Sequence, residues 1–192
     1  MLTETKVKQK NQIVAGVMPW DDNIEFVGVA ETQEVIWLRY GNTHYFKDLP
    51  DAIYRQLEEK YLNDRPAVQY ISGITDDLQR QVELYTFFLY GDIDTIPDWS
   101  DGVLGESENI HFGSDCPSID FEEKNITING ENISRKELRI IEMMRNEMTD
   151  EAIASELGIH LQTFYYHKKK LFKKAGVMTR SGLMVELQKN RL

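Results

Sequence analysis

Residues 148–177 read MTDEAIASELGIHLQTFYYHKKKLFKKAGV, and this stretch decides the fold of the C-terminal part. Thr149 can cap a short helix over 150–157, because its hydroxyl accepts from a free backbone amide of the first turn. Gly158 stands where the chain must leave that helix in a left-handed conformation. A longer helix is expected over 161–174. A short helix, a glycine-containing turn and a basic second helix predict a helix-turn-helix, a motif whose second helix can enter the DNA major groove.

The helix expected over 161–174 carries five lysines and no acidic residue. An inward stripe recurs along it at helical spacing. Its members are Phe164, His167, Leu171 and Ala175. The opposite face therefore presents tyrosine and lysine side chains, which can meet base edges and neutralise phosphates. His167 is interpreted as a packed structural residue rather than a ligand, because it lies on the inward stripe.

Two further helices are expected around this pair. Ser134-Arg-Lys-Glu137 is a capping box, in which hydroxyl and carboxylate each accept from the other residue's backbone amide. A last helix is expected from about Thr179 to Gln188. Ahead of the four helices, Asn129-Gly130 favours a type I′ turn and predicts a β-hairpin. Alternation at Ser118–Phe121 predicts a further short strand.

Three stretches of this part are recognisable together: ISRKELRII over 133–141, MTDEAIASELGI over 148–159 and QTFYYHKKKLFKKAGV over 162–177. They resemble, without a gap, the LuxR-type helix-turn-helix domain of bacterial transcription regulators. The resemblance implies that the third helix reads the major groove. The implied base contacts are Tyr165, Tyr166 and Lys169. The implied contacts to the DNA backbone are Gln162, Thr163, Lys170 and Lys173.

The resemblance also implies a homodimer on double-stranded DNA. The fourth helix matches the dimerisation helix of the family, and the implied contacts are Leu183, Met184 and Leu187. Such dimers bind paired half-sites.

The N-terminal part has a different pattern. Short β-branched and aromatic runs predict strands over 13–18, 24–29 and 35–40. Helical spacing begins after Pro50 and again over 67–90, where Gly73 interrupts it. An α+β unit is therefore expected. Its aromatic residues are expected to fill the core rather than to line a pocket; they are Trp20, Trp37, Tyr40 and Tyr45.

A segment rich in Gly, Pro, Asp and Ser separates the two parts. It predicts a division into an α+β sensor or interaction domain over 1–91, an acidic linker over 92–117, and a β-hairpin with a four-helix domain over 118–192. Four aspartates of the segment suggest a hard-cation site, but they lack the Gly and the bidentate Glu of a calcium loop, so a solvated acidic loop is favoured. They are Asp92, Asp94, Asp98 and Asp101. His111 and Cys116 are too few for structural zinc. No metal or cofactor is predicted.

Charge divides the chain in the same way. Residues 1–132 hold 10 Lys+Arg against 25 Asp+Glu, whereas residues 133–192 hold 12 against 7, so balances of −15 and +5 add to the net −10. The basic part suits DNA and the acidic part suits another partner, for which RNA polymerase, a protein or a small-molecule signal are candidates. A cytoplasmic bacterial regulator is expected, since one cysteine fits a reducing compartment and neither a membrane span nor an apolar leader is visible.

Two alternatives remain open from the sequence. A small sigma factor of the extracytoplasmic type has a similar length and a C-terminal helix-turn-helix, but it requires a helical N-terminal domain. An enzymatic or ligand-binding N-terminal module with an accessory helix-turn-helix is the other alternative. No set of nucleophile, base and orienting residue is visible among four histidines and one cysteine, so an enzyme is not predicted.

Overall fold

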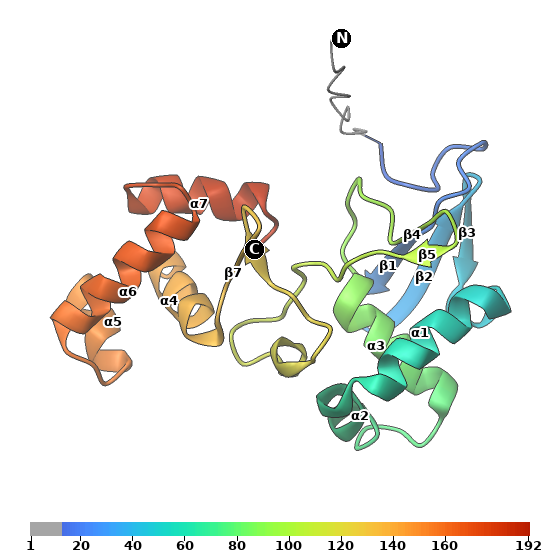
Figure 1. Cartoon of the computed structure of the whole chain (residues 1–192), viewed down its shortest axis with the longest axis horizontal. Helices are drawn as coiled ribbons and strands as arrows, with labels where there is room; N and C mark the ends of the chain where they lie inside the picture. The colour runs from blue at the N-terminus through green and yellow to red at the C-terminus, as the bar shows by residue number, and fades with distance from the viewer. Residues whose placement is uncertain (1–12) are drawn as a thin grey trace, which may run out of the picture.

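The computed structural model describes residues 13–192, which form two lobes (Figure 1). Each lobe has its own hydrophobic core. The buried residues of one core lie between Ile24 and Phe121, and those of the other between Ile126 and Leu192. The predicted absence of an apolar leader rests on residues 1–10, which lie outside the part of the chain that the structure describes.

The N-terminal lobe contains a three-stranded antiparallel sheet, formed by β1 (Glu25–Val29), β2 (Glu34–Arg39) and β3 (Asn42–Tyr45) in that order. The strands predicted over 24–29 and 35–40 are confirmed as β1 and β2. The strand predicted over 13–18 is wrong. Gly16 there has a φ of +71° and its amide donates to the Asp21 carboxylate at 2.8 Å, so the segment forms turns instead.

Three helices complete this lobe: α1 (Asp51–Asn63), α2 (Arg65–Ile71) and α3 (Leu78–Tyr90). The break predicted at Gly73 is confirmed, and α3 restarts with the Asp77 carboxylate accepting from the Gln79 amide. Helix α3 packs on β1 and β2 (Figure 1). A Cβ at Gly28 of β1 would lie 2.7 Å from the Phe87 ring, so only glycine allows this close approach.

The aromatic residues of the sheet are divided between the core and the surface. Trp37 is buried and stacks on His44 at 4.1 Å between ring centroids. Trp20, Tyr40 and Tyr45 are exposed, so the prediction that they fill the core is wrong. The reason is position, because they lie in the turns and at the edge strand β3, whereas α3 covers β1 and β2.

The segment expected as an acidic linker is largely irregular, but it packs on the N-terminal lobe. It contains the short strands β4 (Trp99–Ser100) and β5 (Val103–Leu104), and Leu104 and Cys116 are buried. The prediction that Ser118–Phe121 forms a strand is wrong. Pro117 instead begins a 3-10 turn over 117–120, and Phe121 packs against the rings of Tyr85 and Phe88.

The C-terminal lobe begins with a hairpin of β6 (Thr127–Ile128) and β7 (Glu131–Asn132). Asn129 and Gly130 both have positive φ, +51° and +79°, as the predicted type I′ turn requires. The helices that follow are α4 (Arg135–Arg145), α5 (Asp150–Glu156), α6 (Leu161–Lys174) and α7 (Arg180–Lys189). The fold is therefore mixed α/β. None of the helices in residues 13–192 has the length and apolarity to cross a bilayer.

Candidate nucleic-acid interface

Helix α4 is fixed at its start by the capping box that the sequence predicts. The Ser134 hydroxyl accepts from the Glu137 amide at 3.3 Å, and the Glu137 carboxylate accepts from the Ser134 amide at 2.9 Å. Lys174 at the end of α6 contacts the same carboxylate at 2.8 Å. Burial raises the pKa of Glu137, but the hydrogen bonds from Lys174 and Ser134 outweigh it and hold the pKa below its ordinary value. One carboxylate therefore joins the start of α4 to the end of α6.

Helices α5 and α6 form the helix-turn-helix. Thr149 caps α5 by accepting from the Ala152 amide at 3.2 Å, and Gly158 leaves α5 with a φ of +63°. Phe164 and Leu171 of α6 are fully buried, and the core around them includes Ile153 of α5. The inward stripe predicted for α6 is therefore confirmed for its apolar members. His167 is half-buried.

The opposite face of α6 is exposed along its length. Tyr166 is 66% exposed and Tyr165 45%. The other exposed side chains of this face are Gln162, Thr163, Lys169, Lys170 and Lys173. The structure thus brings all the residues that the sequence assigns to DNA contact onto one helix and turns them toward solvent. These seven residues are called the α6 face below.

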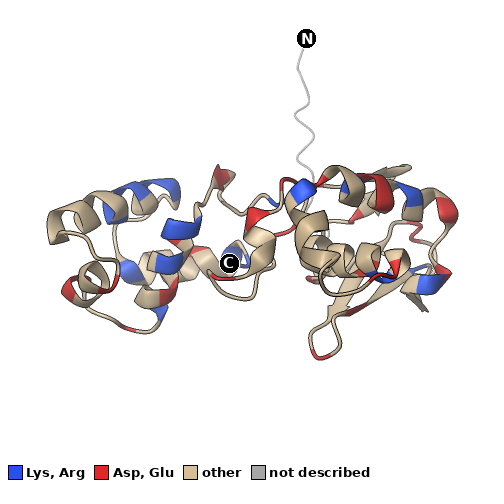
Figure 2. Ribbon diagram, turned by 90° about the horizontal axis from the view of Figure 1, so that it is seen from below, with Lys and Arg blue, Asp and Glu red and all other residues tan. Residues whose placement is uncertain are grey.

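The five lysines of α6 fall into two groups. Lys168 contacts the Asp150 carboxylate at 2.7 Å and Lys174 contacts Glu137, so both hold the lobe together. Lys169, Lys170 and Lys173 form no ion pair within residues 13–192. Figure 2 shows basic residues gathered on helices of the C-terminal lobe. Three cationic groups on the α6 face are therefore available to phosphates.

A shallow apolar hollow of about 430 Å³ adjoins the α6 face. It is lined by Tyr165, Phe172 and Met178, with lysine side chains at its edge. Met178 is 96% exposed and was not singled out from the sequence. The sequence feature that could have pointed to Met178 is its position directly after the Gly-Val pair that follows α6, where the chain turns toward α7.

The three residues assigned to dimerisation differ in exposure. Leu183 and Leu187 of α7 are fully buried in the core of their own lobe and offer no surface to a second chain in this structure, so their assignment stays a prediction. Both sit on the face of α7 that packs inward, and Met184 beside them is half-buried. The exposed residues of α7 are Ser181, Val185, Gln188 and Lys189.

Contacts between the two lobes stay away from the α6 face. Arg191 pairs with Asp92 at 2.5 Å, and the Asn109 side chain donates to the Asn190 carbonyl at 2.7 Å. Among the hydrogen bonds and ion pairs of residues 13–192, none joins residues 13–121 to α6. The N-terminal lobe consequently leaves the helix-turn-helix uncovered.

Replacing Lys174 by Met is expected to destabilise the C-terminal lobe by about 1–3 kcal/mol, because Glu137 keeps its charge but loses its cationic partner. The contribution of Glu137 is present above its ordinary pKa, near 4.5, and is lost as the pH falls through its lowered folded-state pKa. Urea unfolding at pH 7 and pH 4 measures both effects. Lys173→Met is the matched control, since Lys173 has no ion partner in the described part of the chain. An equal loss in both variants would contradict the assignment.

A family model described as bacterial regulatory proteins, luxR family, matches residues 131–187. This match confirms the resemblance drawn from the sequence: residues 131–187 are a LuxR-type helix-turn-helix domain, a DNA-binding domain of transcription regulators rather than of enzymes. The match does not extend to the N-terminal lobe. No curated protein and no solved structure matches the chain.

Proposed function

We propose that this protein is a sequence-specific transcription regulator in which α6 lies in the major groove of DNA. The observation that carries the proposal is the division of the α6 lysines. Two are consumed by ion pairs within the lobe, whereas Lys169, Lys170 and Lys173 are exposed and without such partners. The free-energy cost of bringing such a lysine to a phosphate is small, because no ion pair within the lobe has to be broken.

Within the α6 face we assign different roles by position. Tyr165, Tyr166 and Lys169 meet base edges, where the tyrosine rings suit the methyl group of thymine and the lysine suits guanine. The remaining members of the α6 face contact the DNA backbone and fix the register of the helix. They are Gln162, Thr163, Lys170 and Lys173.

We further propose that the protein acts as a dimer through the exposed face of α7. Val185 is 52% exposed and lies one turn after Ser181 and about one turn before Gln188. We place the contact on this face rather than on the buried leucines, and Met184 stands at its border. The dimer places two α6 helices on paired half-sites.

The two separate cores support a division of labour between a C-terminal DNA-binding domain and an N-terminal regulatory domain. The N-terminal sheet is antiparallel, which differs from the alternating parallel plan of a phosphoacceptor receiver and from an all-helical sigma-factor domain. Its exposed aromatic residues on β3 and the preceding turn suit a protein or small-molecule partner.

Selection of bound DNA from a random pool tests the proposal with the full chain. We expect enriched sequences with two related half-sites. Lys169→Ala should weaken binding and relax the preference at one position of each half-site, at a cost of about 1–3 kcal/mol. Lys173→Ala should weaken binding about equally for all sequences. Enrichment of no sequence, or unchanged affinity in both variants, would overturn the assignment of α6.

A further inference from the structure

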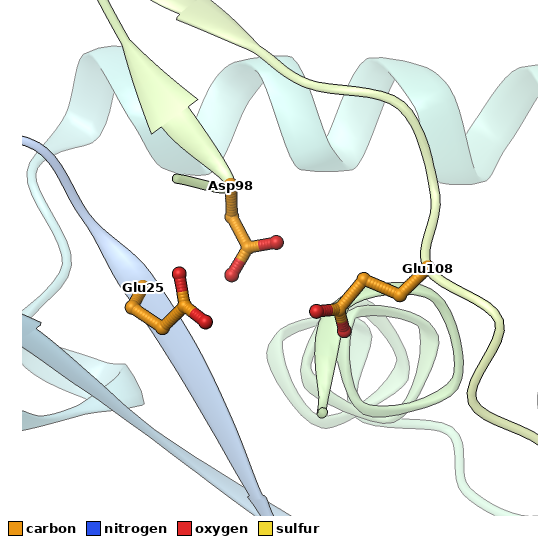
Figure 3. A group of neighbouring side chains, drawn as sticks. All are labelled: Glu25, Asp98 and Glu108. Carbon is orange, nitrogen blue, oxygen red and sulfur yellow. The ribbon is translucent and has the colours of Figure 1, made fainter. Parts of the chain in front are cut away.

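Three carboxyl groups from distant parts of the chain meet inside the N-terminal lobe. Glu25 comes from β1, Asp98 from the residue before β4, and Glu108 from the segment after β5. One carboxylate oxygen of each lies within 4.8 Å of the other two. Figure 3 shows the three side chains pointing toward a common centre. Asp98 is only 3% exposed, so the sequence prediction that it belongs to a solvated acidic loop is wrong.

Two oxygens of this carboxyl cluster have no hydrogen-bond partner among residues 13–192. Glu25 is fully buried; its Oε1 accepts from the Asp94 amide at 2.6 Å, whereas its Oε2 has no partner. The two oxygens of Glu108 also differ. Its Oε2 accepts from the Asp92 amide at 2.8 Å, whereas its Oε1 is buried and has no partner in the described residues. Buried polar atoms are normally satisfied, so orphaned oxygens at one point indicate a missing ligand.

The cluster has no ion-paired countercharge in the described residues, although Arg191 and Lys124 lie close enough to act on Glu25 and Glu108. No lysine or arginine of residues 13–192 pairs with its members, since Arg191 is held by Asp92 and Lys124 donates to the Phe88 carbonyl at 2.6 Å. Charged carboxylates that are buried close together repel one another and lose their hydration, and both effects cost free energy. A positive charge placed among the carboxylates would remove this electrostatic penalty.

The donor set and its spacing specify the ligand. Carboxylate oxygens without nitrogen or sulfur suit hard divalent cations. Calcium holds its ligands at about 2.3–2.6 Å, so any two of its ligands lie no more than about 5.2 Å apart. The three carboxylate oxygens all lie within 4.8 Å of one another, which satisfies this bound.

A cavity between the lobes adjoins the cluster. Asp98 and Glu108 line a cavity of about 710 Å³ between the lobes, whose other walls are the segment around Asp92 and the end of α7. The cavity leaves room for the waters that complete the coordination of a hard cation.

We propose that Glu25, Asp98 and Glu108 form a binding site for a hard divalent cation of the size of Ca²⁺. The ion joins β1 to the segment over 92–109, which is otherwise largely irregular, and it does so beside the contacts that connect the two lobes. Its binding therefore stabilises the N-terminal lobe.

The test uses the full chain after removal of metal by a chelator. Calorimetry with Ca²⁺ should show one ion per chain, and a hundredfold excess over Kd should raise the Tm by about 5 °C or more. Glu108→Gln should abolish binding while it keeps the shape of the side chain. Glu106→Gln is the matched control, because Glu106 is exposed in the same cavity outside the cluster and its loss should change nothing.

A second readout does not depend on stability. Tb³⁺ placed at the site should emit on excitation of Trp99, which adjoins Asp98, and Ca²⁺ should displace it. If Glu108→Gln does not fold, as shown by circular dichroism, Asp98→Asn takes its place with the same expected loss. Failure of the native chain to bind Ca²⁺, Mg²⁺ or Mn²⁺ at millimolar concentration overturns the proposal, as does equal loss of binding in Glu106→Gln.

Discussion

Replacement of Lys169, Lys170 and Lys173 together by Ala is expected to lower the affinity for the selected DNA by about 10²–10³-fold at about 0.1 M salt. Each lysine that neutralises a phosphate contributes roughly 0.9 to the slope of log affinity against log salt concentration. Lys170 and Lys173 are the two members assigned to phosphates, so the slope should fall by about 2 per chain. The structure gives the reason for choosing these three lysines. Replacement of Lys168 or Lys174 would break an ion pair within the lobe, so a loss of DNA affinity could then reflect a loss of stability.

The control removes the same charge elsewhere. Lys47, Arg55 and Arg65 are exposed on the N-terminal lobe and form no ion pair within residues 13–192. Their joint replacement by Ala should change affinity and salt slope far less. Fluorescence anisotropy with labelled DNA over a series of salt concentrations measures both quantities. Equal effects of the two triple variants would show that net charge, and not the α6 face, governs binding.

Replacement of Lys124 by Met is expected to stabilise the protein by about 2–3 kcal/mol at pH 7. Burial lowers the pKa of Lys124 from its ordinary 10.5 to about 7, although the nearby Glu108, Cys116 and Asp92 oppose the shift. Such a shift costs on the order of 4 kcal/mol at neutral pH. Loss of the hydrogen bond to the Phe88 carbonyl gives back about 1–2 kcal/mol.

The pH dependence identifies the cause. The unfolded chain holds the Lys124 proton up to pH 10.5, whereas the folded chain releases it near pH 7, so the penalty is complete below pH 7 and disappears as the pH rises toward 10.5. The stability difference between Lys124→Met and the native chain should therefore shrink between pH 7 and 9.5. Urea unfolding in the presence of a chelator measures it. A difference independent of pH would show that packing, not the buried charge, is responsible.

Much of the C-terminal lobe could be predicted from the sequence because its determinants are local. The capping box at Ser134, the cap at Thr149, the turn at Asn129-Gly130 and the glycine after α5 each act within a few residues. The outward face of α6 followed from helical periodicity alone. In the N-terminal lobe the same kind of signal gave β1, β2 and the break at Gly73.

The differences from the sequence predictions share a cause, which is that the deciding contact lies far away in the sequence. Residues 13–18 have the composition of a strand, but the Gly41 amide donates to the Gly16 carbonyl at 2.8 Å and helps to hold Gly16 in a turn. Phe121 belongs to an alternating pattern typical of a strand, but its ring packs against Tyr85 and Phe88 of α3 in the N-terminal core. Leu187 is assigned to dimer contact by the resemblance, and only the packing of α7 shows that its side chain lies in the core of its own lobe.

The sequence by itself determined a basic helix-turn-helix and the exposed face of its second helix, because caps, glycines and periodicity act over one or two helical turns. The tertiary structure alone decided which lysines of that helix form ion pairs in the described residues, since Asp150 and Glu137 reach two of them from other helices. It alone also gathered Glu25, Asp98 and Glu108, which stand up to 83 residues apart and meet because β1 and the irregular segment after α3 pack together. Contacts that cross such distances depend on the folded chain, and no local pattern encodes them.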